Sequence, residues 1–430
     1  MPSSLRSARA LPRLASPAIA ALVFALAACT QGDAAPAAGP ASDAAADPAA
    51  IHDAVLVFDG HADLLLPQTP ARYYLPDGGK RTSIDRLETG GVDAIVFSIA
   101  AGPGADTPQA DAEAAALADA KLEAVQSWLT DAGDRAALAR SADDIERLQG
   151  EGKVAVLLGF QNARILGRDL GAFDRFHAAG VRIAGLVHAG HNAFADSSRP
   201  QAGQAAALHG GLSPLGRDAV RRFNDLGVLV DVSQLTPDGV LQTLEITRTP
   251  VIASHSNVRA LIDHPRNLGD DELDAIRTNG GVVLVTPFNS YLHAPTVQER
   301  ARIAVVRQAH GLPRDFDVHN LQAGSEALAE PARSRAQDAL KQAEARADVG
   351  ELVAHIDYLV QRLGIDHVGI GSDFDHGAGI DGFDSPADAP KVTAELVRRG
   401  YTQDQIAAIW GGNVLRALRA AQAAATPESG

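Results

Sequence analysis

The chain of 430 residues is 46% hydrophobic and 21% charged, which is ordinary for a globular protein of one large domain or two smaller ones. Its net charge of −15 argues against a nucleic-acid partner, which needs a basic face. Aromatic residues are only 4% of the chain, so Ala, Val, Leu and Ile must fill the core, as in layered helix-and-strand proteins. The single cysteine, Cys29, excludes an internal disulfide.

Residues 1–28 have the pattern of a signal peptide. Three arginines precede the apolar stretch A-I-A-A-L-V-F-A-L-A-A, which is too short to span a bilayer. The sequence L-A-A-C that ends at Cys29 resembles the bacterial lipoprotein lipobox, which implies cleavage before Cys29 and a lipid anchor on it. An unlipidated secreted protein is the alternative. Thr30 rather than Asp after the cysteine favours the outer membrane over the inner one.

Residues 29–50 are rich in Ala and Pro and predict an unpacked tether. After them, apolar runs alternate with longer amphipathic segments, and such runs suit a parallel sheet buried on both faces. The eight runs are 55–61, 92–98, 154–161, 181–188, 227–234, 250–256, 280–288 and 367–373. This alternation predicts an α/β fold, a TIM (β/α)8 barrel, over residues 51–425. A doubly wound open sheet is the alternative, but no G-x-G-x-x-G follows an early strand.

The connection 289–350 between the last two predicted strands is longer than a barrel requires. Its charged sequence predicts a solvated pair of helices. A lid or a subunit contact is the alternative interpretation.

Polar residues follow several of the predicted strands, and in a barrel these strand ends meet at one rim, where active sites lie. They are His61 with Asp63, Gln161, His188, Gln234, His255 and Asp373. A lone histidine is more often a structural, hydrogen-bonded residue. Three histidines and two aspartates on one rim instead indicate a metal site. The His-x-Asp spacing agrees, because alternate residues of a strand share a face.

These residues and the surrounding motifs resemble the membrane (renal-type) dipeptidase family, peptidase family M19, from about residue 55 to 420. The motifs are F-D-G-H-A-D-L, G-V-R-I-A-G-L-V-H-A-G-H-N, P-V-I-A-S-H-S, H-P-R-N-L-G-D-D and G-I-D-H-V-G-I-G-S-D-F-D. The resemblance implies an amidohydrolase-like barrel with two zinc ions that cleaves dipeptides, including those with a C-terminal D-residue.

The resemblance also implies roles for individual residues. His188 matches the histidine that polarises the substrate carbonyl or binds the oxyanion. Arg266 matches the arginine that holds the substrate's C-terminal carboxylate, for which its bidentate fork is suited. Asp373 matches an aspartate near the bridging water, where it could handle the proton during attack.

His61 and Asp63 match ligands of the first metal, and His255 matches a ligand of the second. Two positions depart from the family: Gln161 stands where the metal-bridging glutamate is expected, and Gln234 where the other second-metal histidine is expected. An amide oxygen is a weak, neutral zinc ligand. We therefore expect the binuclear centre to be impaired.

Three hypotheses about the metal remain open. One ion is held by His61, Asp63 and either His255 or Asp373. Alternatively, a nearby histidine, His376 or His191, completes the second site, although each is more simply a loop or pocket residue. In the third, no catalytic metal binds and the pocket serves another purpose.

The sequence therefore predicts a lipid-anchored, periplasm-facing zinc dipeptidase with one or two ions, acting on short peptides; a homodimer is compatible with it. Retention of His188 and Arg266, which recognise substrate in the family, supports this prediction. A non-hydrolytic peptide- or carboxylate-binding lipoprotein is one alternative. An enzyme with altered chemistry on a peptide-derived metabolite is the other.

Overall fold

The computed structural model describes residues 47–319 and 321–426. The predicted signal peptide, Cys29 and most of the predicted tether lie outside the described residues. The described chain begins with helix α1 (Pro48–Ala54), which is capped by Asp47 because its side chain accepts the Ala49 N–H. Among the helices of the described residues, none is long and apolar enough to cross a membrane.

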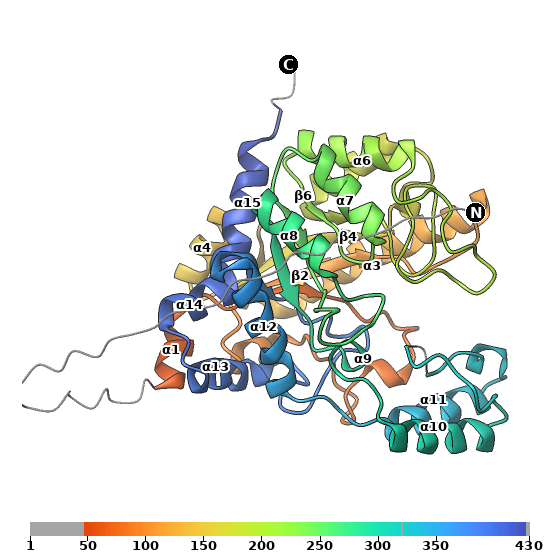
Figure 1. The fold of residues 1–430 in the computed structure, drawn as a ribbon. Helices are drawn as coiled ribbons and strands as arrows, with labels where there is room; N and C mark the ends of the chain where they lie inside the picture. Colours follow the sequence, from red (N-terminus) through yellow and green to blue (C-terminus); the bar gives the residue numbers. More distant parts are fainter. Residues whose placement is uncertain (1–46, 320, 427–430) are drawn as a thin grey trace, which may run out of the picture. The chain divides into compact units, whose positions relative to one another are not determined.

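Eight parallel strands form the predicted barrel, and each overlaps one of the eight apolar runs (Figure 1). In spatial order they are β1 (Phe58–Ala62), β2 (Ala94–Ala100), β4 (Val154–Gln161), β5 (Val181–Gly185), β6 (Leu229–Asp231), β7 (Val251–Ala253), β8 (Val282–Val285) and β9 (Val368–Ile370). A ninth strand, β3 (Ala136–Leu138), pairs with the start of β4. It was not predicted, because three residues are too few to show a strand pattern.

The ends of the first and last barrel strands meet through two backbone hydrogen bonds. Asp373 N donates to His61 O at 2.7 Å, and Asp63 N donates to Phe374 O at 2.9 Å. The contact therefore brings three predicted site residues together at the carboxyl end of the barrel.

Helices surround the sheet and connect its strands (Figure 1). Besides α1 they are α2 (Ile84–Thr89), α3 (Pro108–Ala132), α4 (Ala142–Gly150), α5 (Asp174–Ala179), α6 (Pro214–Asp225), α7 (Pro237–Ile246), α8 (Asp270–Asn279), α9 (Asn289–Leu292), α10 (Val297–Ala309), α11 (Ala332–Ala343), α12 (Val349–Leu363), α13 (Ala389–Arg398), α14 (Gln403–Ala407) and α15 (Asn413–Ala423). Three begin with proline directly after a capping side chain, Thr107, Ser213 or Thr236, which accepts a first-turn N–H.

The predicted helical pair in the connection 289–350 is present as α10 and α11. The two helices pack on each other through a small apolar cluster that includes Ile303 and Leu340. They lie beside the barrel, at the lower right of Figure 1. The connection is therefore a folded addition rather than a bare loop.

Small residues let the barrel interior close at the site. A Cβ on Gly60 would lie 2.1 Å from Leu284 Cδ1, and one on Gly371 would lie 2.0 Å from Ser254 O. Real Cβ atoms do not approach other atoms so closely. Gly371 therefore allows the end of β9 to pass against the end of β7, where the site begins.

Gly371→Ala is expected to lower the free energy of unfolding by about 2–3 kcal/mol, because the new methyl overlaps backbone that cannot move freely. Gly150→Ala is the control, since its added methyl would meet no atom within 4 Å. Urea denaturation of both variants measures the effect. Equal stability of the two variants would contradict the close approach at Gly371.

Candidate active site at the carboxyl rim of the barrel

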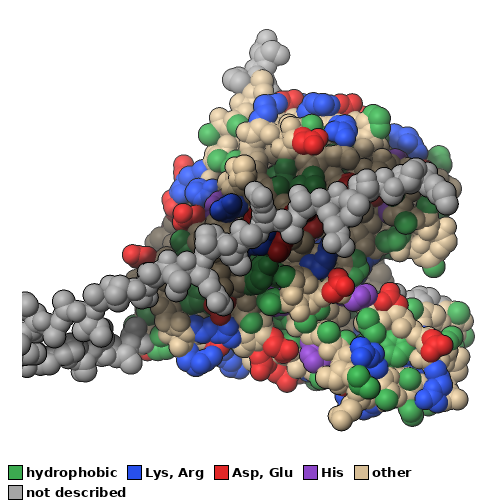
Figure 2. Space-filling view, in the orientation of Figure 1, with side chains coloured by type: hydrophobic (Ala, Val, Ile, Leu, Met, Phe, Trp, Pro, Cys, Tyr) green, Lys and Arg blue, Asp and Glu red, His purple; other side chains and the backbone are tan. Residues whose placement is uncertain are grey.

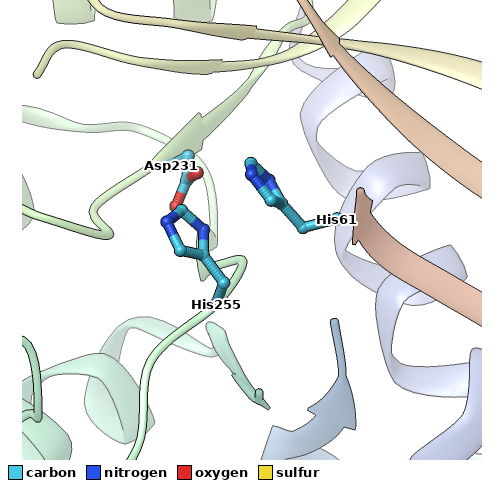
Figure 3. Close-up of side chains that lie close together, drawn as sticks. All are labelled: His61, Asp231 and His255. Carbon is cyan, nitrogen blue, oxygen red and sulfur yellow. The ribbon is translucent and has the colours of Figure 1, made fainter. Parts of the chain in front are cut away.

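Ser254, directly after β7, orients the two histidines predicted to bind metal. Its Oγ lies 3.2 Å from Nδ1 of His61 and 2.8 Å from Nδ1 of His255, and it donates to Asp231 Oδ2 at 2.6 Å. The two imidazole rings stack with centroids 4.0 Å apart. Figure 3 shows the three side chains that contact Ser254 pointing toward one another: His61 on β1, Asp231 at the end of β6 and His255 on the loop after β7.

The serine also fixes the protons of these rings. A hydroxyl has one hydrogen, and the Ser254 hydrogen is taken by the Asp231 carboxylate. Both Nδ1 atoms must therefore donate to the serine oxygen. The Nε2 atoms of His61 and His255 are left unprotonated, which is the form that binds metal.

Gln161 and Gln234 both contact His255, since each amide nitrogen lies 3.3 Å from His255 Nε2. The orientation of Gln234 follows from its other partner: Arg199 Nη2 donates to its Oε1 at 3.2 Å, and arginine cannot accept a hydrogen bond. An NH2 group, which cannot bind a cation, therefore faces His255. That these glutamines replace metal ligands of the family stays a prediction from the resemblance.

Backbone strain is concentrated at this rim. The non-glycine residues with positive φ in the described ranges are Asn162 (φ 82°), Gln234 (φ 72°), Asp373 (φ 54°) and Asp375 (φ 62°). All four follow the ends of β4, β6 or β9. Asn and Asp tolerate a positive φ, whereas Gln seldom adopts it, so the strained residue of this set is Gln234, which contacts His255.

Asp63 is paired with groups of the protein itself. The Lys121 ammonium from α3 forms a buried ion pair with its Oδ1, which also accepts the Leu64 N–H at 2.7 Å. His376 Nδ1 donates to Oδ2 at 3.0 Å. Burial alone raises the pKa of Asp63, but Lys121 and His376 outweigh it and hold this pKa well below its usual range. The negative charge of Asp63, which was predicted to bind the first metal, is thus already offset by Lys121 and His376.

His188 contacts this group through His376, with 3.2 Å between their Nε2 atoms. Burial, followed by the positive charges of His376 and Arg199, holds the pKa of His188 well below its ordinary value. His188 is therefore neutral, and its Nδ1 has no hydrogen-bond partner among the described residues. An uncharged imidazole at this rim suits the predicted contact with a substrate carbonyl.

Arg266 is buried beneath the rim. Its Nη2 donates to His255 O at 2.9 Å, and its guanidinium lies 5.3 Å from the centre of the Tyr291 ring. No carboxylate of the described residues forms an ion pair with it, and its Nε has no hydrogen-bond partner among them. A buried cation without an anion is what the predicted carboxylate-binding role requires.

The remaining predicted residues separate into two groups. Asp373 is buried, and its Oδ1 lies 3.8 Å from His61 Nε2, so it belongs to the site. His191 does not adjoin it in the same way: its Nδ1 accepts the Ser197 N–H at 3.0 Å and its Nε2 lies 2.9 Å from Ala205 O. Both ring nitrogens of His191 are therefore used by its own loop, and the histidine that adjoins the site is His376.

Sequence reasoning missed four residues of the site: Asp231, Ser254, Lys121 and Arg199. A visible signal existed for Asp231, a charged residue inside the apolar run 227–234. Ser254 directly precedes His255, but only the histidine was predicted to have a role. A signal also existed for Lys121, which shares one face of its helix with Ala114, Ala118 and Val125. No pattern marks Arg199 in a loop, because only tertiary packing brings it to the rim.

The donors present can be tested against a metal ion. The buried group of His61, Asp231 and His255 could bind a metal, but the Ser254 hydroxyl already lies within hydrogen-bond distance of one atom of each. An ion would instead use Nε2 of His61, with Asp373 as the nearby carboxylate, and Nε2 of His255, where it would displace the two amide NH2 groups that lie 3.3 Å away. Imidazole and carboxylate ligands suit zinc. The residues therefore fit one ion.

A second ion fits less well. It would meet amide NH2 groups beside His255 and the Lys121 ammonium beside Asp63. Neither supplies the negative charge needed to offset another divalent cation.

The fold and the rim define a (β/α)8 barrel of the metal-dependent hydrolase type. The family model described as membrane dipeptidase (peptidase family M19) matches residues 46–429. A solved structure titled the probable dipeptidase PvdM from Pseudomonas aeruginosa is 35% identical, with a TM-score of 0.79 and coverage of 88% of this chain and 98% of that one. The chain therefore belongs to the membrane dipeptidase family, peptidase family M19.

Two curated relatives are similar in sequence to this chain over part of their length. Dipeptidase tcpJ of Claviceps purpurea is 30% identical over 298 residues, which are 69% of this chain and 58% of that protein. Dipeptidase aclJ of Aspergillus oryzae is 31% identical over 268 residues, 62% of this chain and 51% of that protein. The chain thus spans little more than half the length of these two relatives.

Proposed function

We propose that the protein is a metal-dependent dipeptidase that hydrolyses short peptides at the bacterial cell envelope. The observation that carries the proposal is the convergence on one rim of His61 and His255, each with an unprotonated Nε2, and Arg266, a buried cation without a carboxylate. The family supports peptides as the substrate class. The lipobox-like sequence at Cys29 supports a lipid-anchored, periplasm-facing protein.

Zinc, when bound by Nε2 of His61 and His255, supplies Lewis-acid polarisation of the scissile carbonyl and a lowered pKa of water. The neutral His188 hydrogen-bonds the carbonyl oxygen as negative charge develops on it. The Asp373 carboxylate accepts the proton of the attacking water and returns it to the leaving amine. Arg266 binds the C-terminal carboxylate and so fixes which amide bond is presented.

We extend the proposal to dipeptides with a C-terminal D-residue. Arg266 recognises a charge rather than a configuration at the Cα atom. A cavity of about 600 Å³, lined by Tyr291 and His264, which both contact Arg266, leaves room for either orientation of the C-terminal side chain.

C-terminally amidated dipeptides are expected to be poor substrates, with kcat/KM reduced by at least about tenfold, because a charged hydrogen bond to Arg266 is lost. Parallel assays of Ala-Ala and Ala-Ala amide measure this. The variant Arg266→Met should make the two rates similar. Equal rates for acid and amide in the unchanged protein would refute the role of Arg266.

A second candidate function is a non-hydrolytic peptide-binding protein, or an enzyme with altered chemistry on a peptide-derived compound. It is favoured by the contacts of Lys121 on Asp63 and of two amide groups on His255, which occupy positions where the family predicts metals. Hydrolysis of L-Ala-L-Ala and L-Ala-D-Ala with zinc, cobalt or manganese separates the candidates. Binding of these peptides without cleavage in any metal would favour the second.

A further inference from the structure

A cavity of about 600 Å³ lies between the carboxyl rim of the barrel and helix α11. In the space-filling view the surface is hollowed beside the α10 and α11 segment, with histidine and charged side chains near the hollow (Figure 2). Residues from both sides line the cavity, among them Arg199, His264, Tyr291, His319 and Lys341. It is larger than recognition of one carboxylate requires.

Arg199 and His264 line this cavity, and Arg266 adjoins it through its contact with His264. Each carries a buried N–H group without a hydrogen-bond partner among the described residues: Nε of Arg199, Nε2 of His264 and Nε of Arg266. For His264 the proton position follows from its contacts. Its Nδ1 accepts the Arg266 backbone N–H at 3.0 Å, so the hydrogen is on Nε2. Burial, with His319, Arg266 and Arg199 nearby, lowers the pKa of His264 to about 2, and the ring is a neutral donor.

One nitrogen of each guanidinium group is already hydrogen-bonded within the site. Nη2 of Arg199 donates to Gln234 Oε1 at 3.2 Å, and Nη2 of Arg266 donates to His255 O at 2.9 Å. The two guanidinium groups are therefore held in place while their Nε atoms stay unpaired. Such a fixed set of donors is prepared for an acceptor from outside the chain.

The unpaired charges of the two arginines also indicate an acceptor from outside the chain. Neither Arg199 nor Arg266 forms an ion pair with a carboxylate of the described residues, whereas Arg346 at the edge of the cavity is paired with Asp381 at 2.8 Å and Asp384 at 3.1 Å. The C-terminal carboxylate of a dipeptide would neutralise one of the two unpaired arginines. One positive charge would remain uncompensated beside it.

A second cavity of about 420 Å³ lies on the other side of Tyr73 and His376, which line both cavities. Its walls are mainly apolar, with Leu64, Leu66 and Leu117 among them. A substrate that extends through both cavities would place an apolar group on this side and its anionic end beside the arginines.

We propose that the substrate carries two anionic groups at its C-terminal end, the α-carboxylate bound by Arg266 and an acidic side chain bound by Arg199 and His264. The preferred substrate class is then a dipeptide with an apolar first residue and an acidic second residue. The kinetic test of this inference rests on the proposed hydrolytic function, whereas the binding test is independent of hydrolysis.

The test compares Leu-Asp with Leu-Asn, which have almost the same shape and differ by one negative charge. In the zinc-loaded protein, kcat/KM for Leu-Asp is expected to exceed that for Leu-Asn by at least about tenfold, because a charge-assisted hydrogen bond distinguishes them. Arg199→Met should reduce this ratio to near one, and Arg199→Lys should retain part of it. Arg168→Met, at an exposed arginine paired with Asp106, is the matched control and should keep the full ratio.

Calorimetry of the same two dipeptides with chelator-treated protein measures binding without turnover. If neither dipeptide is cleaved in any metal but Leu-Asp binds at least about tenfold tighter through Arg199, the substrate class stands and the hydrolytic function fails. If both are cleaved and bound equally well, hydrolysis stands and the second anion site is wrong. If the ratio is unchanged in Arg199→Met, Arg199 has no part in recognition, and the proposal is overturned.

Discussion

His61→Ala is expected to abolish metal retention and to lower kcat by at least about a thousandfold, because the ion supplies both carbonyl polarisation and the activated water. Ser254 holds the His61 ring with its Nε2 unprotonated, so the substitution removes a preformed metal ligand. Elemental analysis and dipeptide hydrolysis on one sample measure the two effects together.

His310→Ala is the control, since His310 lies at the end of α10, away from the rim. It should retain both metal and activity. Unchanged metal content in His61→Ala would remove His61 from the metal site and would mean that other residues hold the ion.

The double variant Gln161→Glu and Gln234→His is expected to bind a second zinc ion, with affinity raised by at least about a hundredfold over the unchanged protein. The change replaces two amide NH2 groups beside His255 with a carboxylate and an imidazole. It also adds one negative charge to offset the extra cation. Zinc content after dialysis, together with the visible spectrum of the cobalt-loaded variant, reports the number and environment of the ions.

Each single variant should bind the second ion more weakly than the double variant. Loading Lys121→Met in the same way shows whether the ammonium on Asp63 also opposes metal binding. If the unchanged protein already holds two zinc ions, Gln161 and Gln234 do not prevent the second ion from binding. The orientation inferred for Gln234 from its contact with Arg199 would then be wrong.

The sequence predicted the barrel and the composition of its rim because both depend on short-range patterns. Apolar runs locate the strands, and the polar residue that ends each run must lie at the carboxyl rim of a parallel barrel. His61, His188, His255 and Asp373 could be placed together for this reason alone. Arg266 entered through the family motif H-P-R-N, and the structure places it directly behind His255.

What the sequence could not show was how these residues are paired. The contact of Lys121 with Asp63 joins a helix to a strand end 58 residues away. The spacing of Ala118, Lys121 and Val125 places Lys121 on the core-facing side of the helix, but it does not show which acid Lys121 contacts. The network around Ser254 likewise depends on the exact approach of β6, β7 and β1. Charge compensation at Asp63 is therefore a tertiary property, although it bears directly on how many metal ions the site accepts.

Arg199 illustrates the same limit for substrate recognition. It lies in the long segment between β5 and α6, where composition suggests only a surface loop. In the folded protein it contacts Gln234, one of the two glutamines that the resemblance marked as unusual. Gln234, predicted from the resemblance to stand in place of a metal-binding histidine, is thus bonded to a cation that lines the cavity.

The metal stoichiometry and the hydrolytic function are tested together by the zinc content per chain of the purified protein after dialysis against dilute zinc, with hydrolysis of Ala-Ala and L-Ala-D-Ala on the same sample. We predict one ion per chain and turnover that is lost on chelation and restored by zinc. Two ions per chain with turnover would contradict the effect assigned to Gln161, Gln234 and Lys121, and no turnover with any divalent metal would contradict the hydrolytic function itself.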